Sequence, residues 1–471
     1  MASSSNAEIR RPGARRARAA AALALAAALA GAPAPGGAQT VSLTPDEMQG
    51  AATAALAAGD PAQALALVDA LLRRDPGDVT ARILRSRALR DLGRYDAALA
   101  AGQAAWRDAD SDGDRYYAAL AVAQALSSRG DRTLAQLWLR RAVEVAPDPR
   151  LEARAIRDFR YVRARNPWAT QLSFSVTPSD NVNDGSVRDE ISFAGIDGVE
   201  LSPTAQALSG LEIAAGVATR YTLSQSATHR TRAGVSLYHE TFVLSDEAKD
   251  DAPEAEGSDF AYSAAALTFG QEFRPEGWSG PLELSGVAAR SWYAGEPYAR
   301  TLELSVSRGL ALSPRDRLRL TLGADRVALE PDEGADDRAT AWEAGAAWLH
   351  RLESGAAVRL SANLRESHSE RASLDYTRSR LGAAYSLAEP VLGARATLGL
   401  EMERRHYLAF PFEFDGRHDH GLEARVDLVF GALDWYGFVP TLRLFTSETK
   451  STADRYDSRE SGIDLGFRSA F

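Results

Sequence analysis

The C-terminal part of the chain alternates apolar and polar residues with a period of two. In TLELSVSRGLAL, for example, Leu302 and Leu304 share one face, whereas Glu303 and Ser305 share the other. Alternating segments of about ten residues are typical of transmembrane β-barrels, which are apolar outside and polar inside. A water-soluble sandwich also alternates, but its strands usually have only five or six residues. Strands can cross a bilayer only as a closed barrel, because lipid contains no water to hydrogen-bond the unpaired backbone groups of an open sheet edge.

Two kinds of connecting segment separate these strands. Short turns rich in Gly, Pro and Ser fall at 224–228, 275–280, 313–316, 352–355, 388–390 and 431–434. Longer polar segments fall at 177–209, 245–257, 331–337, 409–416 and 449–455. Outer-membrane barrels have short periplasmic turns and longer external loops. Six short turns join seven hairpins, so the sequence predicts 14 strands, or 16 if one hairpin is missed. With an even number of strands, the start of the first strand and the end of the last strand both lie on the periplasmic side, and so does the domain that precedes the barrel.

The last segment, SGIDLGFRSAF, has the same alternation and ends in phenylalanine. Ile463, Leu465 and Phe467 share one face with the terminal Phe471. Such an ending resembles the signal read by the bacterial barrel-assembly machinery, so we expect that machinery to be a partner through Phe471. Tryptophans occur at positions 168, 278, 292, 342, 348 and 435. Several lie near turns, where an aromatic girdle is expected.

The N-terminus predicts a secretory signal peptide over residues 1–38. Five arginines precede an uninterrupted Ala/Leu run, and small residues allow cleavage after Ala38. Twelve apolar residues are too few to span a bilayer. The chain has no cysteine, which excludes disulfides and a lipidated N-terminal cysteine. Its net charge of -10 argues against binding to nucleic acid, which requires a basic face.

Residues 39–165 contain a helical repeat. Similar segments begin at Gly59, Gly93 and Gly130, which are 34 and 37 residues apart. Small residues recur five positions later, at Ala64, Ala98 and Ala135. A helix–turn–helix unit of 34 residues is typical of tetratricopeptide repeats, which stack into a solenoid. The sequence therefore predicts an α+β multidomain chain, with an N-terminal α-solenoid over 39–165 and an antiparallel transmembrane β-barrel of about 14 strands over 166–471.

Repeat arrays of this kind usually bind peptides on the concave face formed by the first helix of each pair. By repeat position, the candidate client-binding residues on that face are Ile83, Arg87, Arg90, Tyr117 and Gln124. A purely structural role for these side chains is the alternative.

One more helix is expected directly before the first strand. It has an apolar stripe that includes Leu151 and Phe159, and its other face carries Arg154, Arg157, Arg160, Arg163 and Arg165. This face is either a solvated cap of the repeat array or a basic collar for anionic headgroups or a negatively charged client.

The chain shows no motif for catalysis, a cofactor or a metal, so we predict that it is not an enzyme. The segment DADSDGD begins like a calcium loop, but its twelfth position is Ala119 where a bidentate glutamate is needed. His418 and His420 offer two metal ligands without an evident third. Paired carboxylates such as Glu401 and Glu403 are expected in a charged lumen and do not require hydrolase chemistry.

The combination of signal peptide, few tetratricopeptide-like repeats and C-terminal barrel resembles the surface lipoprotein assembly modifier family. The segment NPWATQLSFSVTPSDNVNDGS is similar to the start of that family's barrel, and Trp168, Pro178, Asn181 and Asn183 carry the similarity. The resemblance implies an outer-membrane protein that helps surface lipoproteins, or related secreted proteins, to cross the membrane. The periplasmic repeats would engage the client and the barrel would assist its passage.

Two other functions are compatible with the same sequence. A polysaccharide export porin also joins periplasmic repeats to a barrel, although it usually has a longer array and a lumen of one charge sign. A solute porin with a helical docking domain is the second alternative. Both retain membrane lipid as a partner and need no cofactor.

Overall fold

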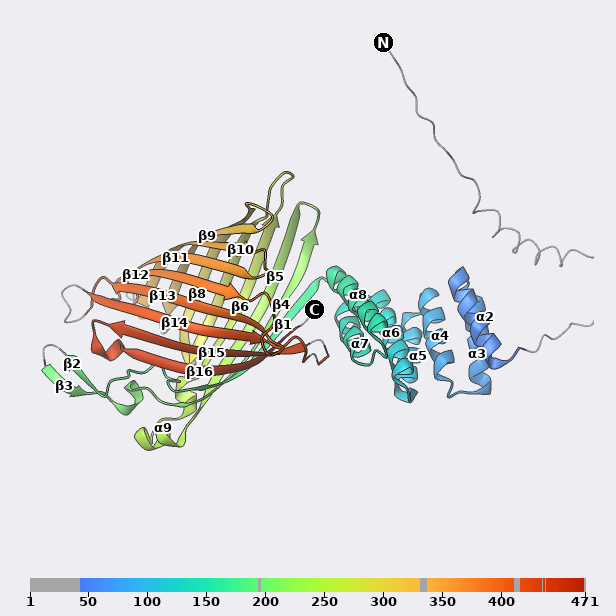
Figure 1. The fold of residues 1–471 in the computed structure, drawn as a ribbon, viewed down its shortest axis with the longest axis horizontal. Coiled ribbons are helices and arrows are strands. Elements are labelled where there is room, and N and C mark those ends of the chain that lie inside the picture. Colours follow the sequence, from blue (N-terminus) through green and yellow to red (C-terminus); the bar gives the residue numbers. More distant parts are fainter. Residues whose placement is uncertain are drawn as a thin grey trace, which may run out of the picture.

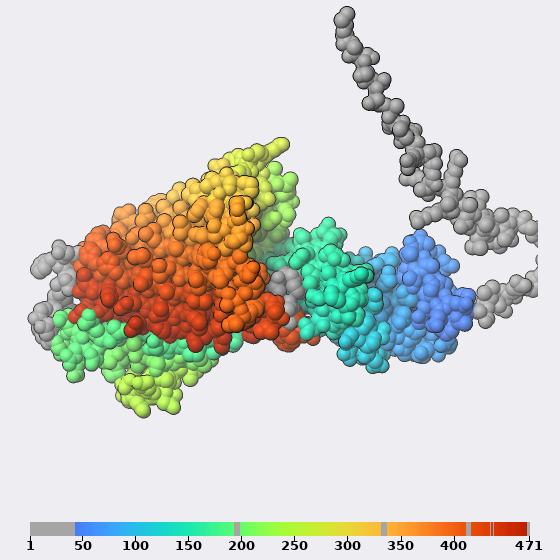
Figure 2. Space-filling model, viewed as in Figure 1, coloured from blue at the N-terminus to red at the C-terminus, as the bar shows by residue number. Residues whose placement is uncertain are grey.

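The computed structural model describes residues 43–193, 196–330, 337–410, 416–433, 435–436 and 438–469. The expected signal peptide and Phe471 lie outside these ranges. The chain forms two lobes, a helical array and a β-barrel (Figures 1 and 2). No helix within the described ranges combines the length and the apolar character needed to span a bilayer.

The described part of the chain before the barrel folds into seven helices. They are α2 (Pro45–Ala58), α3 (Pro61–Arg74), α4 (Val79–Asp91), α5 (Tyr95–Asp108), α6 (Asp112–Arg129), α7 (Arg132–Glu144) and α8 (Pro149–Arg165). The helices stack in a row, with α7 and α8 nearest the barrel (Figure 1). Gly59 and Gly130 end α2 and α6 at φ angles of 80° and 106°, a backbone conformation that favours glycine.

The core of the array consists largely of small side chains. The recurring Ala64, Ala98 and Ala135 are completely buried, as expected for residues that let paired helices approach closely. At Gly102 on α5 the approach is closer still, because a Cβ atom there would lie 2.9 Å from Cγ2 of Val122 and 3.2 Å from Oγ of Ser86. Glycine at this position therefore sets the distance between α5 and the neighbouring helices α4 and α6.

The C-terminal lobe is a closed antiparallel barrel in which every strand pairs with its neighbours in the chain and β1 pairs with β16. Its 14 strands confirm the predicted number. They are β1 (Trp168–Ser179), β4 (Gly210–Gln225), β5 (His229–Leu244), β6 (Tyr262–Phe273), β7 (Leu282–Tyr293), β8 (Glu296–Ala311), β9 (Asp316–Leu329), β10 (Arg338–Arg351), β11 (Ala357–Ser369), β12 (Tyr376–Ser386), β13 (Arg395–Tyr407), β14 (Arg417–Val429), β15 (Phe438–Ser451) and β16 (Ser458–Ser469).

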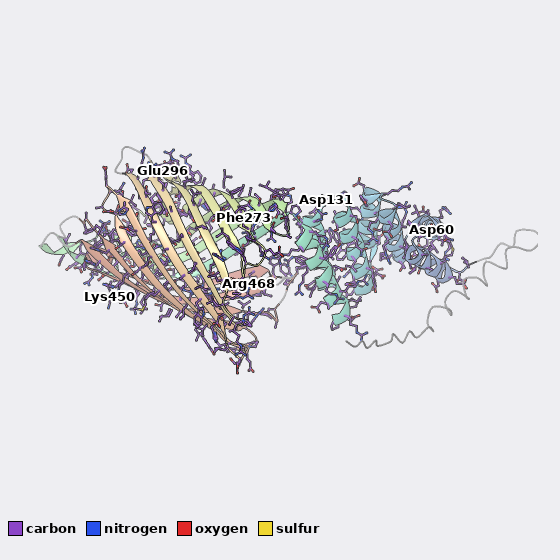
Figure 3. The ribbon with its side chains drawn as sticks, turned by 90° about the horizontal axis from the view of Figure 1, so that it is seen from above. Asp60, Asp131, Phe273, Glu296, Lys450 and Arg468 are labelled. Carbon is purple, nitrogen blue, oxygen red and sulfur yellow. The ribbon has the colours of Figure 1, made fainter. Side chains whose placement is uncertain are left out.

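The two ends of the barrel differ in their connections. Phe273 and Arg468 lie at the end near the helical array, whereas Glu296 and Lys450 lie at the opposite end (Figure 3). We call these the helical end and the loop end. The predicted short turns all lie at the helical end, between β4 and β5, β6 and β7, β8 and β9, β10 and β11, β12 and β13, and β14 and β15.

The loop end carries the longer connections and their small elements. These are β2 (Glu190–Phe193), β3 (Ile196–Glu200), η2 (Pro203–Ala205), α9 (Asp246–Asp251), η3 (Gly257–Phe260) and η5 (Asp454–Tyr456). One connection at this end is unexpectedly short, because only Ala294 and Gly295 join β7 to β8. Their positive φ angles of 49° and 82° correspond to the tight hairpin turn that matches the twist of antiparallel strands.

The alternation in sequence becomes an inner and an outer face. Leu304, Leu322 and Leu364 are 63%, 60% and 62% exposed, and each lies on the apolar side of its strand. Their exposure means that the apolar side faces away from the barrel, toward lipid. The polar side, which includes Asp325 and Glu343, therefore lines the lumen.

Replacing Gly102 by valine should destabilise the helical array by about 1–3 kcal/mol, because the new side chain collides with Val122 and Ser86. The measurement is thermal unfolding of the detergent-solubilised full chain, followed by circular dichroism at 222 nm. Gly50→Ala is the control, since a Cβ atom at Gly50 meets nothing within 4 Å. Equal melting temperatures for the two variants would contradict the packing described.

Leu304→Arg should impair barrel folding, because a lipid-facing arginine near the bilayer centre costs about 2–4 kcal/mol. Ser305→Arg adds the same side chain to the lumen side of the same strand and should fold nearly normally. Heat-modifiable migration on gels reports the folded fraction of each. The assignment of faces would be wrong if Ser305→Arg were the more damaging change.

Candidate functional site

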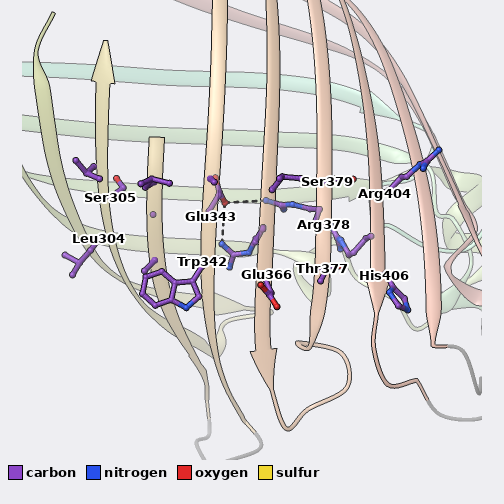
Figure 4. A pocket seen from close by; sticks show the side chains of 18 of the residues that line it. Leu304, Ser305, Trp342, Glu343, Glu366, Thr377, Arg378, Ser379, Arg404 and His406 are labelled. Carbon is purple, nitrogen blue, oxygen red and sulfur yellow. Dashed lines mark ion pairs between the residues drawn. The ribbon is translucent and has the colours of Figure 1, made fainter. Parts of the chain in front are cut away.

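One wall of the lumen carries a network of opposite charges. Arg365 on β11 forms a bidentate pair with Asp325 on β9, with nitrogen–oxygen distances of 2.6 and 2.9 Å. Glu343 on β10 lies 3.5 Å from Arg365 and 3.6 Å from Arg378 (Figure 4). The three strands β9, β10 and β11 and the adjoining β12 are thus linked by one cluster of ion pairs.

The network continues to β15. Its further pairs are Arg380 with Glu401 (3.0 Å), Arg405 with Glu403 (2.7 Å), Arg425 with Glu423 (3.0 Å) and Asp427 (3.6 Å), and Arg443 with Asp427 (2.7 Å). Because most charges on this wall are paired with the opposite sign, the wall lacks the one-sign field of a strongly ion-selective channel.

The facing wall, from β16 through β1 to β6, is built largely from small side chains. Its lumen-side positions include Ser173, Ser175, Gly216, Gly234, Ser236, Thr268, Gly270 and Gly466. A hollow of about 480 Å³ lies against this wall, and Gln171, Ser236, Thr268 and Gln271 contribute to its lining. Small side chains on this wall therefore leave space within the lumen, and Arg220 and Arg232 also line the hollow.

The predicted strand-1 motif begins on the barrel wall and ends in a folded loop. Trp168 is the first residue of β1, is 49% exposed and packs edge-on against Tyr221 of β4. Pro178, near the other end of β1, lies on the outward side of the strand at the loop end. In contrast, Asn181 is only 3% exposed and lies just beyond the strand.

The two asparagines of the motif hold the first loop in place by hydrogen bonds. The side chain of Asn181 donates to the carbonyls of Gly185 (2.9 Å) and Arg459 (3.1 Å) and accepts from the Gly185 amide (2.8 Å). Asn183 donates to the Gln206 carbonyl (2.7 Å) and accepts from the Leu208 amide (2.8 Å). The motif thus connects the start of the loop both to its own end and to β16.

These contacts cross the seam where β1 closes on β16. Between described residues the β1–β16 register runs from Ser175↔Gly466 to Ser179↔Gly462, whereas β1 pairs with β4 along its whole length. At the loop end the seam is reinforced by Arg188, whose guanidinium lies 2.7 Å from Asp457 in the last loop. The hydrogen bond to Asp457 raises the pKa of the Arg188 guanidinium. We call this set of contacts the seam clamp.

Sequence spacing alone cannot reveal the seam clamp. Asn181 and Arg459 are separated by 278 positions, and their contact arises only when the barrel closes. The similarity of the Asn-containing segment to a known family was the one available signal.

On the helical array, the structure divides the five candidate concave-face residues into three groups. Arg90 and Gln124 hydrogen-bond to each other across α4 and α6 and line a hollow of about 220 Å³. Arg87 and Tyr117 are exposed on the same two helices. Ile83 is buried against Ala105, Ala118 and Ala121, so it serves the helix packing.

Asp158 and Tyr161 on α8 also line this hollow, and the sequence-based selection missed them. Tyr161 is 58% exposed, and the Arg165 guanidinium lies 3.6 Å from its ring centre. The signal was present, because Gln124 follows Arg90 by 34 residues and Tyr161 follows Gln124 by 37, the two spacings that define the repeat. We expected α8 to be a cap or a basic collar, and not the first helix of a further pair. We call Arg90, Gln124, Asp158 and Tyr161 the repeat groove.

The helical array docks on the barrel through α7. The guanidinium of Arg140 donates to the Tyr436 carbonyl at 2.8 Å and lies over the rings of Phe159 and Phe438, at 4.9 and 4.5 Å. The Tyr436 amide in turn donates to the carboxylate of Glu144 at 3.1 Å. Arg140 is 8% exposed, so this cation is held in the interface between the two lobes.

The residues singled out for metal chemistry do not converge. His418 and His420 lie on the outward side of β14, whereas Asp419 between them points to the lumen side and pairs with Arg417 at 3.0 Å. Within the described ranges, no group of three or more His, Asp or Glu side chains is arranged to hold a metal ion.

Two family models match the sequence. A tetratricopeptide repeat model matches residues 50–114, and the surface lipoprotein assembly modifier model matches residues 168–471. The chain belongs to the surface lipoprotein assembly modifier family. The match to this family begins at the first residue of β1 and includes the seam clamp and both lumen walls. No curated protein matches the sequence.

Solved structures similar to parts of the chain include outer-membrane proteins and a chaperone. OccAB3 of Acinetobacter baumannii is 7% identical over 64% of this chain and 98% of its own, with a TM-score of 0.36. A BenF-like porin from Pseudomonas fluorescens Pf-5 is 8% identical over 64% and 98%, with a TM-score of 0.37. The type III secretion translocator chaperone SycD of Yersinia enterocolitica is 18% identical over 29% and 96%, with a TM-score of 0.23.

Asn181→Ala should loosen the first loop, because it removes three hydrogen bonds of a buried amide and leaves their partners unsatisfied. A loss of about 2 kcal/mol in local stability is expected. The measurement is the rate of tryptic cleavage after Arg188 in the detergent-solubilised protein. Ser202→Ala, which alters an exposed hydroxyl in the same loop, is the control. If both variants were cleaved at the wild-type rate, Asn181 would not order the loop.

Proposed function

We propose that this outer-membrane protein assists surface lipoproteins, or related secreted proteins, across the membrane, with its helical array in the periplasm. The family match over the barrel is the observation that carries this proposal. The orientation rests on the barrel ends, because outer-membrane barrels place short turns in the periplasm. The helical array lies at the end with the short turns (Figure 1).

The repeat groove is our candidate for the client contact. It combines a cation, an amide, a carboxylate and an exposed tyrosine on α4, α6 and α8, which are the first helices of successive helix pairs. Solenoids present such side chains along one face, where an extended peptide reaches several repeats. Tyrosine and arginine are also the side chains that most often dominate binding energy at protein interfaces.

The lumen is better suited to the passage of a client protein segment than to the selective conduction of ions. Its charged wall is largely neutralised by its own ion pairs, and its small-residue wall leaves space for a chain segment. Periplasm contains no ATP, so passage would be driven by folding of the client outside or by handover from other machinery. The family and the fold are of non-enzymatic kinds.

We also propose that the last strand is recognised during assembly. Ile463, Leu465 and Phe467 are 45%, 52% and 57% exposed on the outward side of β16, and Phe471 continues this parity in sequence. An apolar outward stripe at the end of the chain fits capture by the barrel-assembly machinery before β16 closes on β1.

The proposal predicts that deletion of the gene removes client lipoproteins from the cell surface, measured by protease shaving of intact cells. Complementation with Asp158→Ala/Tyr161→Ala should display about tenfold less client, as expected when an interface hot spot is removed. Arg157→Ala on the same helix is the matched control and should restore display.

The result can fail in two informative ways. If all surface lipoproteins and secreted proteins stay in place while a surface polymer disappears, the chain is an export porin for polysaccharide. If deletion removes the client but the groove variant restores it fully, the client binds elsewhere on the chain.

A further inference from the structure

The outer wall of the barrel carries a cluster of arginines near the loop end. Arg290, Arg300, Arg326 and Arg338 come from four adjacent strands, β7 to β10, and lie on the same outward parity as the exposed leucines of those strands. Ala328 lies at the centre of the cluster, because it pairs with Arg300 on one side and with Arg338 on the other.

Within the described part of the chain, the cluster has more guanidiniums than carboxylates. Arg290 and Arg300 are direct cross-strand partners, an arrangement that is unfavourable for like charges. Glu330 lies between them, with carboxylate oxygens 2.9 and 2.8 Å from their guanidinium nitrogens. Arg326 is exposed and has no ion-pair partner among the described residues. Among the residues that the structure describes, Glu330 is therefore the one carboxylate paired within this group of three guanidiniums, on a surface that also meets lipid.

The height of the cluster corresponds to the headgroup layer. Leu302 on β8 pairs with Arg326. On β10, Thr340 pairs with Arg326, and Trp342 is the next outward-facing residue toward the middle of the strand. Trp342 is 63% exposed, as expected for a residue of the interfacial aromatic girdle. Trp292 lies beside the cluster on the loop side, 5.6 Å from the Arg290 guanidinium. The arginines thus begin where the apolar band ends.

The surface between the arginines is hollowed. A hollow of about 590 Å³ is lined by the four arginines together with Ala288, Ala328, Leu267 and Leu302. A charged rim that continues into an apolar slope matches a molecule with an anionic head and hydrocarbon chains. Arginine binds phosphate in a bidentate manner more strongly than it binds a neutral acceptor.

We propose that this outer-wall cluster is a binding site for a phosphorylated glycolipid, with lipid phosphates between Arg290, Arg300 and Arg326 and acyl chains along Leu267 and Leu302. The site lies in the leaflet at the loop end, which is the outer leaflet in the orientation of the proposed function. The bound lipid would act as the counter-ion that Glu330 supplies only in part.

The test uses the full mature chain, purified in a neutral detergent, delipidated and then incubated with lipid A, which carries two phosphates. Native mass spectrometry measures the bound fraction, with monophosphoryl lipid A and phosphatidylcholine as comparison lipids. We expect lipid A to bind best and phosphatidylcholine least. In the triple variant Arg290→Gln/Arg300→Gln/Arg326→Gln, lipid A binding should fall by about tenfold or more, because three charge-assisted contacts are lost.

The matched control is Arg317→Gln/Arg359→Gln/Arg395→Gln, which removes the same charge from the lumen side of the strands. It should bind lipid A like the wild type. Heat-modifiable migration establishes that each variant is folded. If the triple variant does not fold, Ala328→Glu provides the second test, since it adds a carboxylate among the arginines and should weaken lipid A binding without removing any of them.

Equal binding of lipid A by the outer-wall and lumen variants overturns the proposal, and so does equal binding of all three lipids by the wild type. A chain dimer that the outer-wall variant dissociates, without bound lipid, would show that the cluster is an interface between copies. The shaving assay is read separately: loss of lipid binding with normal client display leaves the proposed function intact, and loss of display with normal lipid binding leaves this site intact.

Discussion

Hydrogen bonding of the backbone in hydrocarbon is the constraint on which the barrel depends. No water can hydrate an unpaired amide there, so every strand needs a partner on both sides and the first strand must meet the last. The pairing of β1 with β16 satisfies this requirement. Once the sheet is closed, side chains of alternate residues are assigned to lipid or to lumen, and the two faces can carry unrelated chemistry.

The two faces use arginine in different ways. On the lumen side, arginines of β11 to β15 are largely neutralised by carboxylates on the same strand or on a strand nearby, so that charge holds the wall together. On the outer side, Arg290 and Arg300 share the Glu330 carboxylate, and Arg326 lies beside them at the edge of the apolar band. In the helical array, Arg140 is enclosed by two rings and a carbonyl and joins two lobes. The surroundings, and not the residue type, decide what each cation does.

Much of the architecture follows from local patterns in the sequence. The alternation and the spacing of short turns predicted 14 strands, and the repeat spacing predicted the helical pairs; the structure confirms both. The two-residue turn at Ala294–Gly295 was not predicted, because the connections at the loop end were expected to be mostly long. Ile83 was selected by position within the repeat, but position does not distinguish a concave surface from the helix contact beneath it. Contacts such as Asn181 with Arg459, or Arg140 with Tyr436, join segments that only the closed fold brings together.

The helical array has a particular relation to the closing seam. Its last helix runs directly into β1, while its α7 holds the turn between β14 and β15 through Arg140 and Glu144. The array therefore straddles β16 at one mouth of the barrel, and the clamp formed by Asn181 and Arg188 straddles the same junction at the other. Both ends of the β1–β16 junction are thus bridged by segments outside the barrel strands, and separating these two strands would strain the α7 contacts at one end and the seam clamp at the other.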